Sequence, residues 1–190
     1  LVEQHWKDRD DFFVGGNMFI YFQLQQSKKN IYKGPDFFVV KNTDSKRDRK
    51  SWMIWNECGQ YPNVIVELAS KSTMKRDLEE KKEIYEKIFR TPEYFCYDPD
   101  QKKLYGWRLE GGFYKEIPVD ENGCMECQEL GLWLGPWNGE HMKYNATWLR
   151  FYTEDGALVP KFSEFEAERA EKEAKRAEKE AKRAEKESEH

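Results

Sequence analysis

Two carboxylates in this sequence stand where short apolar runs would form β-strands. Asp36 follows a Gly-Pro turn and opens the run FFVV, and Glu67 lies inside the run VIVELA, residues 64–69. Burying a carboxylate among apolar residues is costly unless it is paired, hydrogen-bonded or bound to a metal. Two carboxylates from adjacent strands suit Mg²⁺, which takes one or two of them together with waters and phosphate oxygens. Asp36 and Glu67 are therefore predicted metal ligands for Mg²⁺, with Mn²⁺ as an alternative.

A lysine-rich helical pattern follows the Glu67 run directly, opened by Ser72 and Thr73. A metal at the carboxylates would polarise a scissile phosphate and lower the pKa of an attacking water. A nearby lysine could hold that water or stabilise the charge that develops on the phosphate. Two acids, a metal and one cation are the groups that a nuclease needs.

Apolar runs and turn residues outline the elements that position these groups. Strands are predicted at 18–24, 37–40, 51–55, 64–69, 93–97 and 147–152, and a β-hairpin at 104–117 around Gly111-Gly112. A helix from 73 to 89, ended by Thr91-Pro92, joins strands 64–69 and 93–97, which should then be parallel. Residues 15–17 are predicted to be a turn, residues 120–140 loop-rich, and residues 1–13 a helix or an irregular arm. The predicted fold class is α/β, with a central mixed sheet, a βαβ unit, a hairpin and a C-terminal charged helix.

From Phe162 the chain repeats AEKEAKR with a period of seven, and alanines spaced by three and four form a seam. Glutamate–lysine pairs spaced i,i+4 support the helix: Glu168–Lys172, Glu171–Lys175 and Glu178–Lys182. An all-alanine seam buries little area, so a coiled coil would be weak, and a solvated helical tail is the alternative. We expect one domain over residues 1–161, a low-complexity tail over 162–190, and a homodimer.

The formal net charge of −4 excludes a strongly basic, sequence-independent nucleic-acid binder, so affinity for a polyanion must be local. The segment 41–50, just after the Asp36 strand, carries five bases against Asp44 and Asp48. Its bases could contact DNA phosphates, or the segment could be an ordinary exposed loop. Asn17 is a weaker candidate for lining the same cleft. The predicted DNA-binding residues are Lys46, Arg47, Arg49, Lys50 and Lys71.

The sequence lacks the residues that a disulfide scaffold, a zinc site, a phosphate-binding loop or a serine-based catalytic triad would need. Four cysteines are too few and too irregular for a disulfide scaffold, which favours a reducing, cytoplasmic setting. Cys124 and Cys127 have no second pair to complete a zinc site. No glycine-rich loop precedes a helix and no serine–histidine–aspartate set is evident, so no small-molecule cofactor is expected. No run approaches the ~18 apolar residues that a membrane span requires.

Six segments, in order, resemble the Uma-type restriction endonuclease-like family of the PD-(D/E)xK nuclease superfamily. They are GGNMFIYF, GPDFFVV, SWMIW, PNVIVELASKST, RDLEEKKEIY and EYFCYDP. The resemblance covers most of residues 12–160. It implies a nuclease-like domain over 1–161 and a metal-dependent DNA endonuclease, with Asp36 as the aspartate of the PD motif and Glu67 as the acid of (D/E)xK.

The sequence departs from that pattern at the lysine, because Ala69 stands two residues after Glu67. The resemblance implies that Lys81, on the following helix, replaces it as the third catalytic residue. Lys81 shares one helix face with Asp77 and Tyr85. On that face Lys81 could instead pair with Asp77 in solvent, and Tyr85 could be a core residue. Lys71 and Lys82 are the rival lysines. The alternative function is a catalytically degenerate nuclease fold kept as a binding or interaction module.

Overall fold

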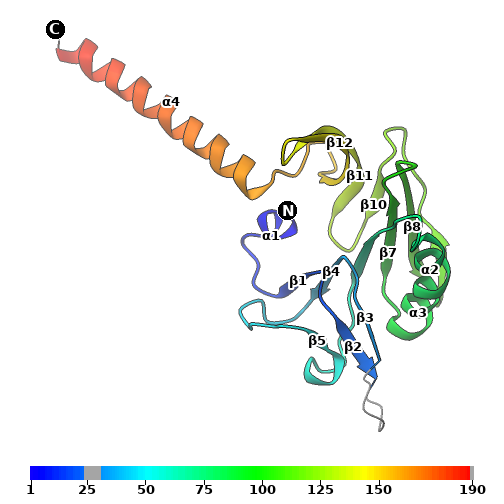
Figure 1. The fold of residues 1–190 in the computed structure, drawn as a ribbon. Coiled ribbons are helices and arrows are strands. Elements are labelled where there is room, and N and C mark those ends of the chain that lie inside the picture. Colours follow the sequence, from blue (N-terminus) through cyan, green and yellow to red (C-terminus); the bar gives the residue numbers. More distant parts are fainter. Residues whose placement is uncertain (24–30, 189–190) are drawn as a thin grey trace.

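The computed structural model describes residues 1–23 and 31–188. A six-stranded mixed sheet forms its centre (Figure 1). The strand order is β1-β4-β6-β7-β8-β9. Its strands are β1 Phe12–Gly16, β4 Phe37–Lys41, β6 Val64–Leu68, β7 Glu93–Asp98, β8 Lys103–Glu110 and β9 Phe113–Glu116. β6 and β7 are parallel, and the other neighbours are antiparallel. The predicted α/β fold with a βαβ unit is confirmed.

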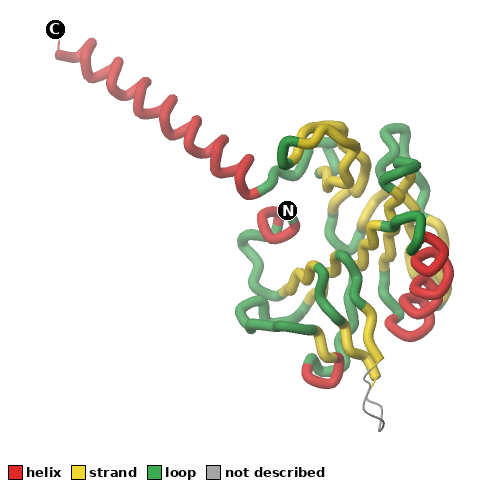
Figure 2. The backbone as a smooth tube through the Cα atoms, viewed as in Figure 1, coloured by secondary structure: helices red, strands yellow, loops and turns green. Residues whose placement is uncertain are grey.

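One helical segment, residues 74–89, crosses from β6 to β7 and covers one face of the sheet (Figure 2). Two α-helical turns, α2 Met74–Arg76 and α3 Lys82–Ile84, alternate with two π-helical turns, η2 Asp77–Lys81 and η3 Tyr85–Phe89. The helix ends at Arg90 in the left-handed conformation, φ 51°, two residues before Pro92. π-helical turns are rare and often mark functional sites.

The opposite face packs against a three-stranded antiparallel sheet: β10 Met125–Cys127, β11 Leu132–His141 and β12 Tyr144–Tyr152. The prediction of a loop-rich segment at 120–140 was wrong, because β11 alone has ten residues. Its glycines allow close contacts instead of turns. A Cβ on Gly135, for example, would lie 2.2 Å from the Cys124 sulfur.

A third small sheet has the order β3-β2-β5, with β2 Ile20–Gln23, β3 Ile31–Lys33 and β5 Trp52–Met53, followed by the 3₁₀ turn η1 Ile54–Asn56. The predicted strand 18–24 ends at Leu24, which lies outside the described residues.

The predicted turn at 15–17 was wrong in part, because Gly15 and Gly16 belong to β1. Gly15 is needed there because the Phe38 ring would lie 2.2 Å from a Cβ.

The two ends of the chain are helical. A single turn, α1 Val2–His5, begins the chain, and α4, Phe162–Ser188, projects away from the body (Figure 1). Arg150, buried in β12, donates to the Glu164 carboxylate at 3.0 Å and so ties the first turn of α4 to the body. Within residues 1–23 and 31–188, we find no helix whose length and apolar character would let it cross a membrane.

Candidate active site

Asp36 and Glu67 lie opposite each other at one end of the central sheet. β4 and β6 pair antiparallel with Phe37 opposite Val66, and the next step of that register places Asp36 opposite Glu67. One carboxylate oxygen of Asp36, Oδ2, accepts a hydrogen bond of 2.7 Å from the backbone N–H of Leu68. The start of one strand and the end of its neighbour thus bring the two acids together.

Glu67 is almost fully buried, with 1% of its surface exposed. Its Oε1 accepts a 2.8 Å hydrogen bond from the Tyr85 hydroxyl and lies 2.9 Å from the Lys81 Nζ. Burial raises the pKa of Glu67 to about 7, although Lys81 and Tyr85 act to lower it. Burial also raises the pKa of Tyr85 well above its ordinary value, so its hydroxyl remains a donor.

Lys81 bridges two carboxylates from the helix side of the sheet. Its Nζ lies 2.9 Å from Glu67 Oε1 and 2.9 Å from Asp77 Oδ1, and its side chain is only 10% exposed. The contact with Asp77 is an ion pair without hydrogen-bond alignment. Burial alone would lower the pKa of Lys81, but Glu67 and Asp77 outweigh it and hold that pKa above its ordinary value. Lys81 is therefore charged.

The rival lysines point elsewhere. The Lys82 ammonium stacks 4.3 Å above the Trp107 ring. Lys71 is 90% exposed and lies 3.9 Å from Asp100. Ala69, in the position where the family pattern has lysine, is buried and contributes its N–H to the Tyr97 carbonyl. Of the three lysines considered, Lys81 is the one that contacts Glu67.

The structure adds Asp77 and Tyr85 to the candidate site, whereas neither residue had a role there from sequence alone. Asp77 reads from sequence as a solvated partner of Lys81, yet it is 2% exposed. Tyr85 reads as core packing, yet its hydroxyl holds Glu67. The signal that could have found both is their spacing with Lys81, i, i+4 and i+8, on the face that turns toward the Glu67 strand.

The two carboxylates fit a divalent metal. Asp36 and Glu67 each use one oxygen in contacts within the protein, and no described residue donates a hydrogen bond to the other oxygen. Nowhere in residues 1–23 and 31–188 do three histidine, cysteine or acidic side chains gather to hold a metal. A two-carboxylate set completed by water and substrate suits Mg²⁺ better than a metal that needs an all-protein cage.

The basic segment 41–50 lies away from this site. Lys41 ends β4 while Asp36 precedes it, so the strand separates them by roughly 16 Å at ~3.3 Å per residue. Proximity in sequence does not bring the segment to the carboxylates. Lys71, just beyond β6, is at the site's end of the sheet.

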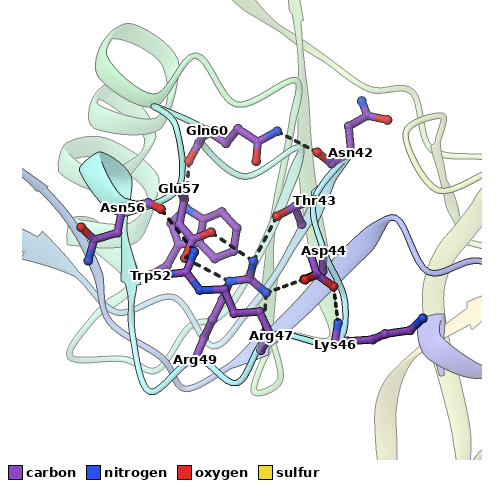
Figure 3. Close-up of polar contacts among 10 residues, drawn as sticks. All are labelled: Asn42, Thr43, Asp44, Lys46, Arg47, Arg49, Trp52, Asn56, Glu57 and Gln60. Atoms are coloured by element: carbon purple, nitrogen blue, oxygen red, sulfur yellow. Dashed lines mark hydrogen bonds and ion pairs between the residues drawn. The ribbon is translucent and has the colours of Figure 1, made fainter.

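Arg49 has a structural role within that segment (Figure 3). Its guanidinium donates two hydrogen bonds of 3.1 Å to the Glu57 carboxylate, and others to Thr43 and to the Asp44 and Arg47 carbonyls. It also lies over the rings of Phe13 and Trp52 at 4.9 and 5.0 Å. With 3% of its side chain exposed, Arg49 is not placed to contact DNA. Three other bases of the segment remain exposed: Lys46, Arg47 and Lys50.

The backbone near Asn17 also approaches the site, since its N–H donates to the Asp36 carbonyl at 3.0 Å.

Comparison with known proteins gives one family. No curated protein matches the chain. The model of the family Uma2, described as "Putative restriction endonuclease", matches residues 1–138, which is more than half of the 190 residues. That match includes the paired acids Asp36 and Glu67 together with Lys81. The chain belongs to the Uma2 family.

Proposed function

We propose that this protein is a Mg²⁺-dependent DNA endonuclease that hydrolyses phosphodiester bonds, with Mn²⁺ able to replace Mg²⁺. One contact carries the proposal: the Lys81 ammonium lies 2.9 Å from the buried Glu67 carboxylate. Glu67 in turn faces Asp36 on the neighbouring strand. The membership in a family of nuclease character supports it.

Each side chain has a role in the proposed reaction. Asp36 and Glu67 would hold the divalent metal, which, when bound, would activate water and polarise the phosphate. Lys81 would donate hydrogen bonds to the attacking water or to a phosphate oxygen and stabilise the growing negative charge. The water oxygen bonds to phosphorus and gives a proton to solvent. One ester P–O bond breaks, and the leaving sugar oxygen takes up a proton from solvent, which leaves a phosphate monoester and a hydroxyl. Asp77 and Tyr85 are positioning residues, because they hold Lys81 and Glu67 in place.

The competing function, a binding module without catalysis, is favoured by Ala69 in the lysine position and by the acidic net charge of the chain. The contact of the Lys81 ammonium with the Glu67 carboxylate supports the nuclease instead, because the helix supplies a cation that Ala69 does not. Isothermal titration of Mn²⁺ separates the two functions: the nuclease requires binding to the wild type that Glu67→Ala abolishes. A wild type that binds no metal would support the module.

The partners and setting follow from the same proposal. DNA is the substrate, and the exposed bases Lys46, Arg47, Lys50 and Lys71 remain proposed phosphate contacts. All four cysteines are free thiols, as a reducing compartment would leave them, and we propose a cytoplasmic location.

The direct test of metal dependence is nicking of a supercoiled plasmid by the purified chain. Nicking in Mg²⁺, its loss in EDTA and its recovery with excess Mg²⁺ or Mn²⁺ are expected. Equal nicking with and without EDTA would contradict the proposal.

A further inference from the structure

A groove lies at the same end of the central sheet as Asp36 and Glu67, on the opposite face. Its volume is about 980 Å³, and it separates the ends of β6 and β7 from the β11–β12 hairpin. The sheet side contributes Leu68, Tyr97 and Lys102, and the hairpin side contributes Asn138, Asn145 and Thr147.

Leu68 joins this groove to the candidate active site. It follows Glu67 directly, and its N–H is bound to the Asp36 carboxylate. Successive side chains of a strand point to opposite faces, so Glu67 faces the helix while Leu68, 54% exposed, faces the groove. A molecule that contacts Leu68 in the groove therefore lies one residue along β6 from Glu67, on the other face of the sheet.

The hairpin face above the groove changes from apolar to polar along its length. Paired residues on that face begin with Leu134 and Phe151 in the core and continue outward through three further cross-strand pairs: Pro136–Leu149, Asn138–Thr147 and Glu140–Asn145. The Thr147 hydroxyl donates to Asn138 Oδ1 at 2.6 Å. That bond holds the Asn138 amide in one orientation, and its NH₂ group donates to no described residue.

One exposed lysine lines the groove, and another lies at the tip of the hairpin. Lys102 lines the groove, and Lys143 stands at the tip of the hairpin beside Met142, where both residues have left-handed φ values of 67° and 52°. Positive φ at both central residues is the geometry that a two-residue type I′ hairpin turn requires. Glu140 is the acid on the same hairpin face, toward the tip.

We propose that this groove and the outer half of the β11–β12 hairpin hold duplex DNA next to the scissile phosphate. Asn138 and Asn145 contact base edges, and Lys102 and Lys143 contact phosphates. A two-stranded ribbon fits the DNA major groove, and an asparagine amide can pair with the edge of adenine. The inference rests on the proposed function, because it places the substrate of the same site.

Binding is tested with a fluorescently labelled, mixed-sequence duplex, measured by anisotropy in EDTA so that no cleavage occurs. The double variant Asn138→Ala/Asn145→Ala is expected to bind about tenfold more weakly than the wild type or worse, as loss of base contacts does. Asn56→Ala/Asn122→Ala, which removes two exposed asparagines outside the groove, is the matched control and should bind as the wild type does.

A second double variant, Lys102→Glu/Lys143→Glu, tests the proposed phosphate contacts. It should weaken DNA binding and make the affinity depend less on salt concentration, because fewer phosphates are contacted. Thermal melting of each variant shows whether its fold persists. Equal affinity of the wild type and both groove variants would overturn the inference, as would no binding by the wild type.

Plasmid nicking in Mg²⁺ separates this inference from the proposed function. Weaker binding by the groove variants, with a wild type that never nicks, would support the groove and contradict the endonuclease. Nicking that the groove variants retain at the wild-type rate and concentration dependence would support the endonuclease and overturn the groove.

Discussion

Lys81 is enclosed by charges of the opposite sign. Its ammonium contacts Glu67 and Asp77, and Asp36 faces Glu67 across the strands. A divalent cation bound by Asp36 and Glu67 would add positive charge beside this ammonium. The same contacts hold the long lysine side chain in one conformation. Substrate binding therefore costs little further conformational entropy at Lys81.

Replacing Lys81 with alanine should therefore lower the nicking rate by at least about a hundredfold, because the ammonium that stabilises charge on the phosphate is lost. Lys82→Ala is the matched control, one residue along the helix, and should keep most of the activity because Lys82 stacks on Trp107. Plasmid nicking measures both. Equal rates for Lys81→Ala and the wild type would remove Lys81 from the reaction.

Tyr85→Phe removes a single hydroxyl while keeping the buried ring. Glu67 would lose one of the two groups that hold its Oε1, and a change of that kind around a metal ligand typically costs 10- to 100-fold in metal affinity or activity, so we expect roughly tenfold. Mn²⁺ titration and nicking measure the effect. An unchanged Mn²⁺ affinity together with an unchanged rate would show that Tyr85 serves packing alone.

At the scale of elements, the crossover helix carries the lysine that strand β6 lacks. Ala69 offers no ammonium, and the helix that follows supplies Lys81 from a π-helical turn, with Tyr85 opening the next one. The loop after β4 has a structural role instead. Arg49 and Glu57 form a buried ion pair (Figure 3). The Arg49 guanidinium also lies over Phe13 of β1 and Trp52 of β5, so it holds this segment against β1.

Removing one partner of that pair should destabilise the fold without touching the active site. Arg49→Ala leaves the Glu57 carboxylate buried, with Arg47 at 3.4 Å as its remaining cation. Breaking a buried pair costs about 3 kcal/mol of unfolding free energy, and Arg49→Lys should restore little of it, because lysine lacks the planar fork. Urea denaturation measures the change. Arg47→Ala, an exposed neighbour, should cost far less. Equal stability of Arg49→Ala and the wild type would show the pair to be dispensable.

The sequence predicted the elements whose patterns are local. The apolar run around Glu67, the helix after it and the Gly111-Gly112 hairpin were all found. The glycines of β1 and β11 misled the prediction, because Gly15 and Gly135 serve contacts between distant segments rather than turns. The candidate site could be predicted as a set of residue types. The burial of Asp77 and of Arg49 could not, since it depends on what packs against them.

At the scale of the whole molecule, the body and α4 meet through Arg150. This buried guanidinium pairs with Glu164, two residues into α4, and its Nε and Nη1 have no partner among the described residues. We propose that the nuclease-like domain extends a few residues beyond position 161 and includes Glu164.

Two truncations test that boundary. A chain ending at Phe165 should unfold at nearly the urea concentration of the full chain. A chain ending at Lys161 leaves Arg150 without its carboxylate and should lose roughly 2 kcal/mol, less than a fully buried pair because Glu164 is partly exposed. Equal stability of the two truncations would place the boundary at residue 161.

The homodimer remains a proposal that α4 would mediate through its alanine seam. Sedimentation velocity of the full chain and of the chain ending at Phe165 tests it. A concentration-dependent dimer only in the full chain is expected, and two monomers would contradict it.

The paired acids carry the whole account, so the most direct measurement is plasmid nicking in Mg²⁺ by the wild type, Asp36→Ala and Glu67→Ala at equal concentrations of folded protein. The wild type should nick the supercoiled plasmid, and both variants should lose that activity. Nicking by either variant at the wild-type rate would contradict the assignment of Asp36 and Glu67 as the metal-binding acids.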